Sequence, residues 1–169
     1  IDYAEYHNLT VTKSAIHSVF DYLYSHYTER RLELLRDKRK ISEYDSENLM
    51  FAVINEVLQN DAFAGLRVIC HQPLRTIIRD FSRLDAEECD FAMLFATHLD
   101  FLIFNRITKK PVRAVEVDGY AFHKEGSDQS RRDKMKNHIL EAYGIPLLRL
   151  ATTGSNEKEK ITSKLEAVL

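Results

Sequence analysis

The stretch Val112–Lys124, VRAVEVDGYAFHK, decides how the rest of the chain is arranged. Its first half reads as a short strand, and Gly119 ends that strand. Because side chains alternate between the two faces of a strand, Glu116 and Asp118 project to the same face. Two carboxylates this close oppose each other's ionisation, and a bound divalent cation would remove that cost. The stretch therefore predicts an acidic, cation-binding site at the end of a strand.

A second strand is expected just before this one, at residues 99–105, with a polar turn between them. If the two strands pair so that Leu102 faces Ala114, then Asp100 lies opposite Glu116. The hairpin is then apolar near its turn and carries its acids at its open end. That distribution is typical of a site rather than of an ordinary surface.

The hydrophobic periodicity predicts both helices and strands. Helices are expected at residues 12–36, 46–60, 127–143 and 156–169, with a short one opening at the SRLD sequence of residues 82–85, and strands at 66–78, 99–105, 112–118 and 145–150. A helix between two consecutive strands indicates a crossover and a parallel pair. We therefore predict an α/β fold: a mixed β-sheet of about four strands flanked by helices, forming one compact unit at residues 46–169 after an N-terminal helical extension at 1–45.

Length and composition limit the classes of protein that the chain fits. It has 169 residues, 44% of them apolar, which is enough for one domain with a proper core. The formal net charge of -2 names no partner. Cys70 and Cys89 show no metal-binding spacing and favour a reducing cytosol, so we expect a cytoplasmic protein. No apolar run approaches the roughly 18 residues needed to cross a bilayer, so no membrane is expected.

The element order, together with Glu47, Asp100 and the run Glu116-Val-Asp118-Gly, resembles the restriction-endonuclease-like PD-(D/E)XK superfamily. Within it, VEVDGYAFHK followed by RRDKMKNHILEAYGIPLLRL is similar to the branch related to the very-short-patch-repair endonucleases. That branch often supplies nuclease-like domains, some of them at the C-termini of superfamily 1 DNA helicases. The resemblance covers about residues 46–153 and implies a restriction-endonuclease-like core of the order αβββαβ.

The resemblance also implies roles for individual acids. Asp100 and Glu116 resemble the two metal-binding acids of the superfamily, and Glu47 resembles the acid that some members carry on the first core helix. Together with Asp118, these acids would hold Mg²⁺ or Mn²⁺. Glu47 also stands in the first turn of a helix, where a carboxylate complements the helix dipole without any site role. His123 resembles a histidine that the very-short-patch group uses in catalysis.

Asp118 departs from the superfamily pattern, because most members have a lysine there that positions or activates the attacking water. Lys136, in the following helix, is the first candidate for a migrated lysine, and Lys124 is the second. The expected catalytic residues are Asp100, Glu116, Asp118, His123 and Lys136. The residues expected to contact DNA phosphates are Arg131, Arg132, Lys134 and Lys124. Basic residues crowded at the start of a helix also suit a solvated face.

Two functions compete. The first is a metal-dependent DNA endonuclease domain within a larger helicase, repair or defence protein, with DNA and a covalently attached helicase region as partners; a start at Ile1 rather than methionine favours such a module. The second is a nuclease-like module that binds DNA without cutting it, which Asp118 and the modest net charge favour. Without a phosphate-cradling glycine-rich loop or a nucleophile motif, a small-molecule enzyme is disfavoured. His71, His98 and His138 are interpreted as structural.

Overall fold

The computed structural model describes residues 13–36, 40–118, 128–151 and 156–168. The chain divides into two compact units, Ile1–Asp45 and Ser46–Leu169. The first unit contains the long helix α2 (Lys13–Arg36). Within the described part of the chain, no helix is long and apolar enough to cross a membrane. The second unit holds every residue of the candidate site that the structure describes.

The second unit is built on a four-stranded sheet with the order β1-β2-β3-β4. The strands are β1 (Leu66–Pro73), β2 (His98–Asn105), β3 (Pro111–Asp118) and β4 (Leu147–Ala151). Neighbours β1–β2 and β2–β3 run antiparallel, and β3–β4 run parallel because the helix α6 (Asp128–Ala142) carries the chain back between them. This confirms the predicted α/β fold with a mixed sheet. Leu102 faces Ala114, as the predicted hairpin register requires.

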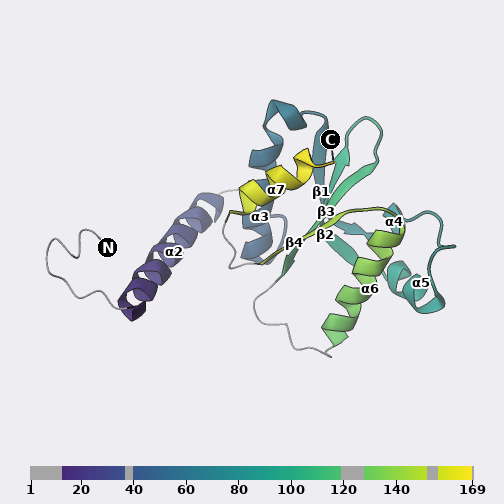
Figure 1. Cartoon of the computed structure of the whole chain (residues 1–169), viewed down its shortest axis with the longest axis horizontal. Coiled ribbons are helices and arrows are strands. Elements are labelled where there is room, and N and C mark those ends of the chain that lie inside the picture. The colour runs from purple at the N-terminus through teal and green to yellow at the C-terminus, as the bar shows by residue number, and fades with distance from the viewer. Residues whose placement is uncertain (1–12, 37–39, 119–127, 152–155, 169) are drawn as a thin grey trace, which may run out of the picture. The chain divides into compact units, whose positions relative to one another are not determined.

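Helices cover both faces of this sheet (Figure 1). The remaining helices of the unit are α3 (Asp45–Leu58), η1 (Asp61–Phe63), α4 (Leu74–Ile77), α5 (Ala86–Met93) and α7 (Glu157–Glu166). Figure 1 shows α3 and α7 on one side of the sheet, and α5 and α6 on the other. Ile139 and Leu140 of α6 are buried in one apolar cluster with Leu102 of β2. The second half of α6 is thereby held against the sheet by hydrophobic contact.

The strand predicted for residues 66–78 ends earlier, at Pro73, and α4 follows it. Proline has no N–H to donate to a continuing ladder, and its φ of -62° also suits the residue before a helix. The Leu74 amide donates instead to the carbonyl of Thr97, with an N···O distance of 3.0 Å. The apolar run therefore turns into the core at Pro73 instead of extending the strand.

The short helix expected to open at SRLD begins directly after that sequence, at Ala86. Asp85 is its N-cap: the Asp85 side chain accepts from the Glu88 amide at 2.8 Å, and Glu88 Oε2 accepts from the Asp85 amide at 3.1 Å. Ser82 does not cap the helix, because its hydroxyl donates to Asp80 at 3.0 Å. A capping box is therefore present at Asp85 and Glu88, three residues later than Ser82 and Asp85 of the SRLD pattern would place it.

The connection from α6 to β4 passes through Gly144, whose φ of 66° lies in the left-handed region that glycine adopts without strain. The helix predicted at residues 127–143 therefore ends, as expected, before this glycine. The strand predicted at residues 145–150 is a nearly continuous apolar run, which is typical of a strand buried on both faces. It lies instead at the edge of the sheet, where Leu147, Leu148 and Arg149 are half-buried and Leu150 is buried. An apolar run alone does not distinguish an edge strand from a central one.

Candidate active site

The open end of the β2–β3 hairpin holds two carboxylates. Because the two strands are antiparallel, Asp100 near the start of β2 meets Glu116 near the end of β3. The Asp100 amide donates to Glu116 Oε1 at 3.3 Å, and the Val117 amide donates to Asp100 Oδ2 at 2.8 Å. Each carboxylate is therefore positioned by the backbone of the neighbouring strand, which fixes the two acids relative to each other.

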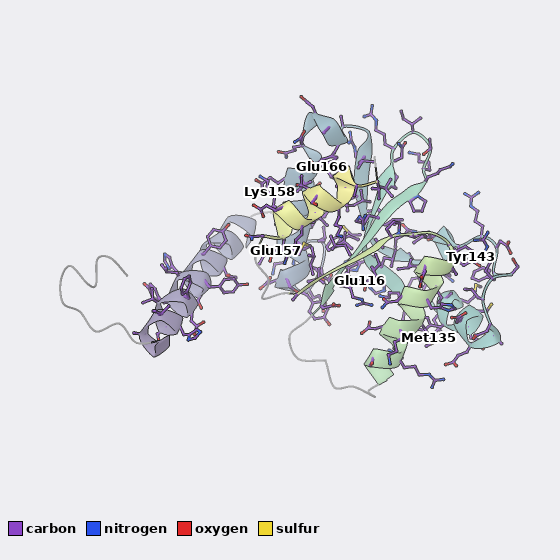
Figure 2. All side chains as sticks on the ribbon, viewed as in Figure 1. Glu116, Met135, Tyr143, Glu157, Lys158 and Glu166 are labelled. Atoms are coloured by element: carbon purple, nitrogen blue, oxygen red, sulfur yellow. The ribbon has the colours of Figure 1, made fainter. Side chains whose placement is uncertain are left out.

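Glu116 is buried, with 5% of its surface exposed, and Figure 2 labels it within the sheet region. Burial raises the pKa of Glu116 to about 7; the charge of Lys136 opposes this rise, and the charge of Asp100 adds to it. A carboxyl group with a pKa near 7 gains and loses its proton in neutral solution. Such a perturbed group beside a specific charged partner is typical of a functional site.

Lys136 reaches the same carboxylate from α6. Its Nζ lies 2.7 Å from Glu116 Oε2, and the two side chains are 14% and 6% exposed. The sequence pointed to Lys136 as the first candidate for a migrated lysine, and the structure brings its ammonium group to the sheet end where Glu116 contacts Asp100. Two acids and one cation thus converge from three different elements.

Asp118 is joined to an arginine of the neighbouring strand. Arg149 Nη1 donates to Asp118 Oδ1 at 2.7 Å, while Nη2 donates to two side chains of α6, Asn137 Oδ1 at 3.0 Å and Asp133 Oδ1 at 3.3 Å. We call these four residues the Arg149 bridge. Burial lowers the pKa of Arg149, but the charges of Asp118 and Asp133 outweigh burial and leave this pKa raised. The guanidinium therefore stays charged and neutralises Asp118.

The structure places Glu47 beside His71. Glu47 Oε2 and His71 Nε2 lie 3.4 Å apart, and both atoms are buried without a hydrogen-bond partner among the described residues. The His71 backbone has a φ of 51°, which is uncommon for a residue other than glycine and recurs at functional sites. Burial and the charge of Glu47 raise the pKa of Cys70 to about 11, so this thiol stays protonated at neutral pH and is a poor nucleophile.

The predicted DNA-contacting cations lie on the first half of α6. Arg131, Arg132 and Lys134 are all exposed there. Arg131 forms an ion pair with Glu87 of α5, so one of the three cations already has a protein partner. His123 and Lys124 lie outside the described residues.

The acids fit a magnesium or manganese ion in one particular way. Among the described residues, no group of three or more histidine, cysteine, aspartate or glutamate side chains could hold a metal ion, so Glu47 and Asp118 do not join Asp100 and Glu116 in such a group. Mg²⁺ nevertheless uses one or two carboxylates together with waters and substrate phosphates. Asp100 and Glu116 supply that minimal set of oxygen donors.

Two residues of this region were not singled out from the sequence. Arg149 lies inside IPLLRL, which was interpreted only as a strand, yet a charged residue within an apolar run signals a buried polar contact. His71 was interpreted as structural, and neither its backbone conformation nor its contact with Glu47 leaves a mark in the sequence. Both features appear only once the strands are aligned.

These observations define an α/β domain with a buried glutamate, an aspartate and a lysine at one end of its sheet. A family model described as "Protein of unknown function (DUF2726)" matches residues 40–168. The chain belongs to this family, and the match spans the whole described part of the sheet unit. Neither a curated protein nor a solved structure matches the chain.

Proposed function

We propose that residues 46–169 form a metal-dependent nuclease domain that hydrolyses phosphodiester bonds of DNA. The single observation that carries this proposal is the convergence of Asp100, Glu116 and Lys136 at one end of the sheet. Hydrolysis of a polyanion needs acids that hold a metal ion and a cation that stabilises negative charge. The sequence resemblance to the restriction-endonuclease-like superfamily supports the same function.

The proposed roles follow from the positions of the side chains. Asp100 and Glu116 hold Mg²⁺ or Mn²⁺, which when bound supplies an activated water and neutralises charge on the phosphate. Lys136, already beside Glu116, holds the scissile phosphate or the attacking water. His123 transfers a proton, as the resemblance suggests. The cations Arg132 and Lys134 of α6 contact the DNA backbone together with Arg131 and Lys124.

The proposal includes partners and a setting. DNA is the substrate, and the domain acts as a module of a longer DNA-processing protein with a covalently attached helicase region. Cys70 and Cys89 are both free, which agrees with a reducing, cytoplasmic environment. These parts of the proposal rest on the sequence resemblance and on the state of the cysteines.

The alternative is a nuclease-like module that binds DNA without cutting it. It is favoured by one specific observation: Asp118 stands where most of the superfamily has lysine, and its charge is taken up by Arg149. In this alternative the Glu116–Lys136 pair only stabilises the fold. The cations at the start of α6 would then be the functional surface.

One assay separates the two functions. Labelled single-stranded, duplex and branched DNA are incubated with the protein and Mg²⁺ or Mn²⁺, and in parallel with EDTA. Under the nuclease proposal, cleavage requires the metal ion and falls at least about 100-fold in Lys136→Met, a loss typical of removing one donor that stabilises charge in the transition state. Lys158→Met is the matched control. Lys158, on α7, pairs with Glu56 at 2.7 Å, the same distance as between Lys136 and Glu116. Binding without cleavage under all metal conditions supports the DNA-binding module instead.

A further inference from the structure

Arg149 is the residue in which three elements meet at the edge of the site. It belongs to β4, and its guanidinium contacts Asp118 on β3 and both Asp133 and Asn137 on α6. The parallel register pairs Glu116 with Arg149, so Arg149 stands directly beside the buried glutamate in the sheet. The planar guanidinium has several donors in a fixed fork, which allows one side chain to hold several acceptors at once.

The two α6 residues that Arg149 holds flank Lys136. Asp133 lies three residues before Lys136, and Asn137 directly follows Lys136. Residues three and four apart lie on one side of a helix, so Asp133 shares a side with both Lys136 and Asn137. The fully buried apolar side chains of α6, Ile139 and Leu140, lie in its second half. Met135, directly before Lys136, packs partly buried against the same apolar cluster as these two side chains. The polar contacts with Arg149 add a link from this part of α6 to β4, the strand that pairs with β3 beside Glu116.

We propose that Arg149 is a positioning residue, which holds α6 against β3 and β4 so that the Lys136 ammonium stays on the Glu116 carboxylate. Asp118 then has a defined role, because it anchors Arg149 from the strand that also carries Glu116. Asp118 stands where most members of the resembled superfamily have a lysine. By holding Arg149, it helps to position Lys136, a lysine that comes from α6 instead. The catalytic importance of this arrangement rests on the proposed nuclease function, whereas the arrangement itself is tested without any cleavage.

The direct test measures how fast Lys136 reacts with an amine-acylating reagent in the intact chain, read by mass spectrometry of its peptides. A buried, ion-paired ammonium reacts slowly, and exposed Lys134 of the same helix provides the internal reference. Arg149→Met keeps the apolar stem of the side chain. In this variant we expect the reactivity of Lys136 relative to Lys134 to rise about tenfold, because the free energy of one charge-assisted hydrogen bond corresponds to about this factor.

Asn137→Ala serves as a second variant in case Arg149→Met does not fold. Asn137 contacts Arg149 from α6, and its removal leaves the contact between Arg149 and Asp118 in place. It should raise the reactivity of Lys136 by a smaller factor. Arg131→Met is the matched control, because Arg131 also joins α6 to another element, namely to Glu87 of α5, and should leave Lys136 protected. A Lys136 that stays protected in both bridge variants overturns the proposal.

If the protein cleaves DNA, kinetics distinguishes a positioning role of Arg149 from a merely stabilising one. If Arg149 acts through Lys136, then adding Arg149→Met to Lys136→Met lowers the cleavage rate of the folded protein no further. Independent, multiplying losses would contradict positioning even if the melting temperature falls in each variant. If the parent does not cleave any DNA, the nuclease proposal fails, and the acylation result still decides the role of Arg149.

Discussion

Two lysine–glutamate pairs of this domain have the same N···O distance and different surroundings. Lys136 Nζ lies 2.7 Å from Glu116 on one side of the sheet, and Lys158 Nζ lies 2.7 Å from Glu56 on the other. The first pair is 14% and 6% exposed and the second is 54% and 55% exposed. Figure 2 shows Lys158 on α7, near the labelled Glu157 and Glu166, and away from α6.

The comparison teaches that burial, rather than distance, gives an ion pair its chemical consequences. Around Lys158 and Glu56 water competes with the contact, and an exposed pair of this kind adds little to stability. Around Glu116 water is excluded, so burial raises the pKa of the acid to about 7 although a cation touches it. Breaking such a pair leaves an uncompensated buried charge. Four predictions test this contrast, from the largest effect to the smallest.

The largest effect is expected for Lys136→Met. Removing the cation leaves Glu116 buried and unpaired, which should lower the free energy of unfolding by about 3–5 kcal/mol at pH 8. At pH 5 the loss should be smaller, because Glu116 is neutralised by a proton instead. Urea unfolding at the two pH values measures both. Lys158→Met should leave stability unchanged at either pH, and equal losses in the two variants would show that burial does not distinguish the pairs.

The second prediction concerns pH and the parent protein. The pKa of Glu116 is about 7 in the folded state against 4.5 for an ordinary glutamate. Between these values the folded state binds the extra proton, so the contribution of Glu116 to stability falls as pH rises from about 4.5 to about 7, by up to about 3 kcal/mol. Glu116→Gln should flatten this part of the profile in metal-free buffer. Glu56→Gln should preserve it.

The third prediction asks whether Asp100 and Glu116, and not Glu47, bind the metal ion. Calorimetric titration with Mn²⁺ should show Asp100→Asn weakened by more than the roughly 10–100-fold typical of a change outside the ligand shell. Glu47→Gln should bind almost as the parent does, since Glu47 contacts His71 instead of Asp100 or Glu116 in the described structure. If Asp100→Asn binds Mn²⁺ with the same affinity as the parent protein, then the assignment of Asp100 to a metal site is wrong.

The smallest effect is expected at His138. This residue lies on α6 and contacts Glu88, which forms part of the capping box of α5. The hydrogen bond and the charge of Glu88 raise the pKa of His138. A raised pKa means that this contact contributes fully below the ordinary histidine pKa of about 6.5 and is lost as pH rises through the folded-state value. The melting temperature of His138→Gln should therefore fall below that of the parent at pH 5.5 and equal it at pH 9.

Much of the fold could be predicted from the sequence because its signals are local. Alternation in VRAVEV indicated β3, helical periodicity indicated α6, and the order of the elements indicated the mixed sheet. The end of β1 was predicted wrongly, because the residues after Pro73 are apolar whether the chain continues as a strand or turns into the core. Local patterns do not record that choice.

The contacts of the candidate site likewise divide into those that the sequence predicted and those that it did not. Asp100 and Glu116 were predicted to meet, because the register of a hairpin follows from its own sequence. Lys136 was named as a candidate from its place in the following helix. The partner of Asp118 was not predicted, since Arg149 lies 31 residues away in sequence and the pairing depends on the parallel register of β3 and β4. Contacts across a crossover are fixed by tertiary packing, which a single sequence does not display.

The pairing of Asp118 with Arg149 also constrains how this domain can change. A single substitution Asp118→Lys would introduce the lysine that is common in the superfamily that the sequence resembles, but it would place that new cation against Arg149, whose guanidinium now lies 2.7 Å from the acid. Like charges at such a distance repel. Arg149 would then have to change too, and Lys136 would lose its support on α6. The two arrangements are thus separated by a coupled exchange of at least two residues, and neither single step preserves the site.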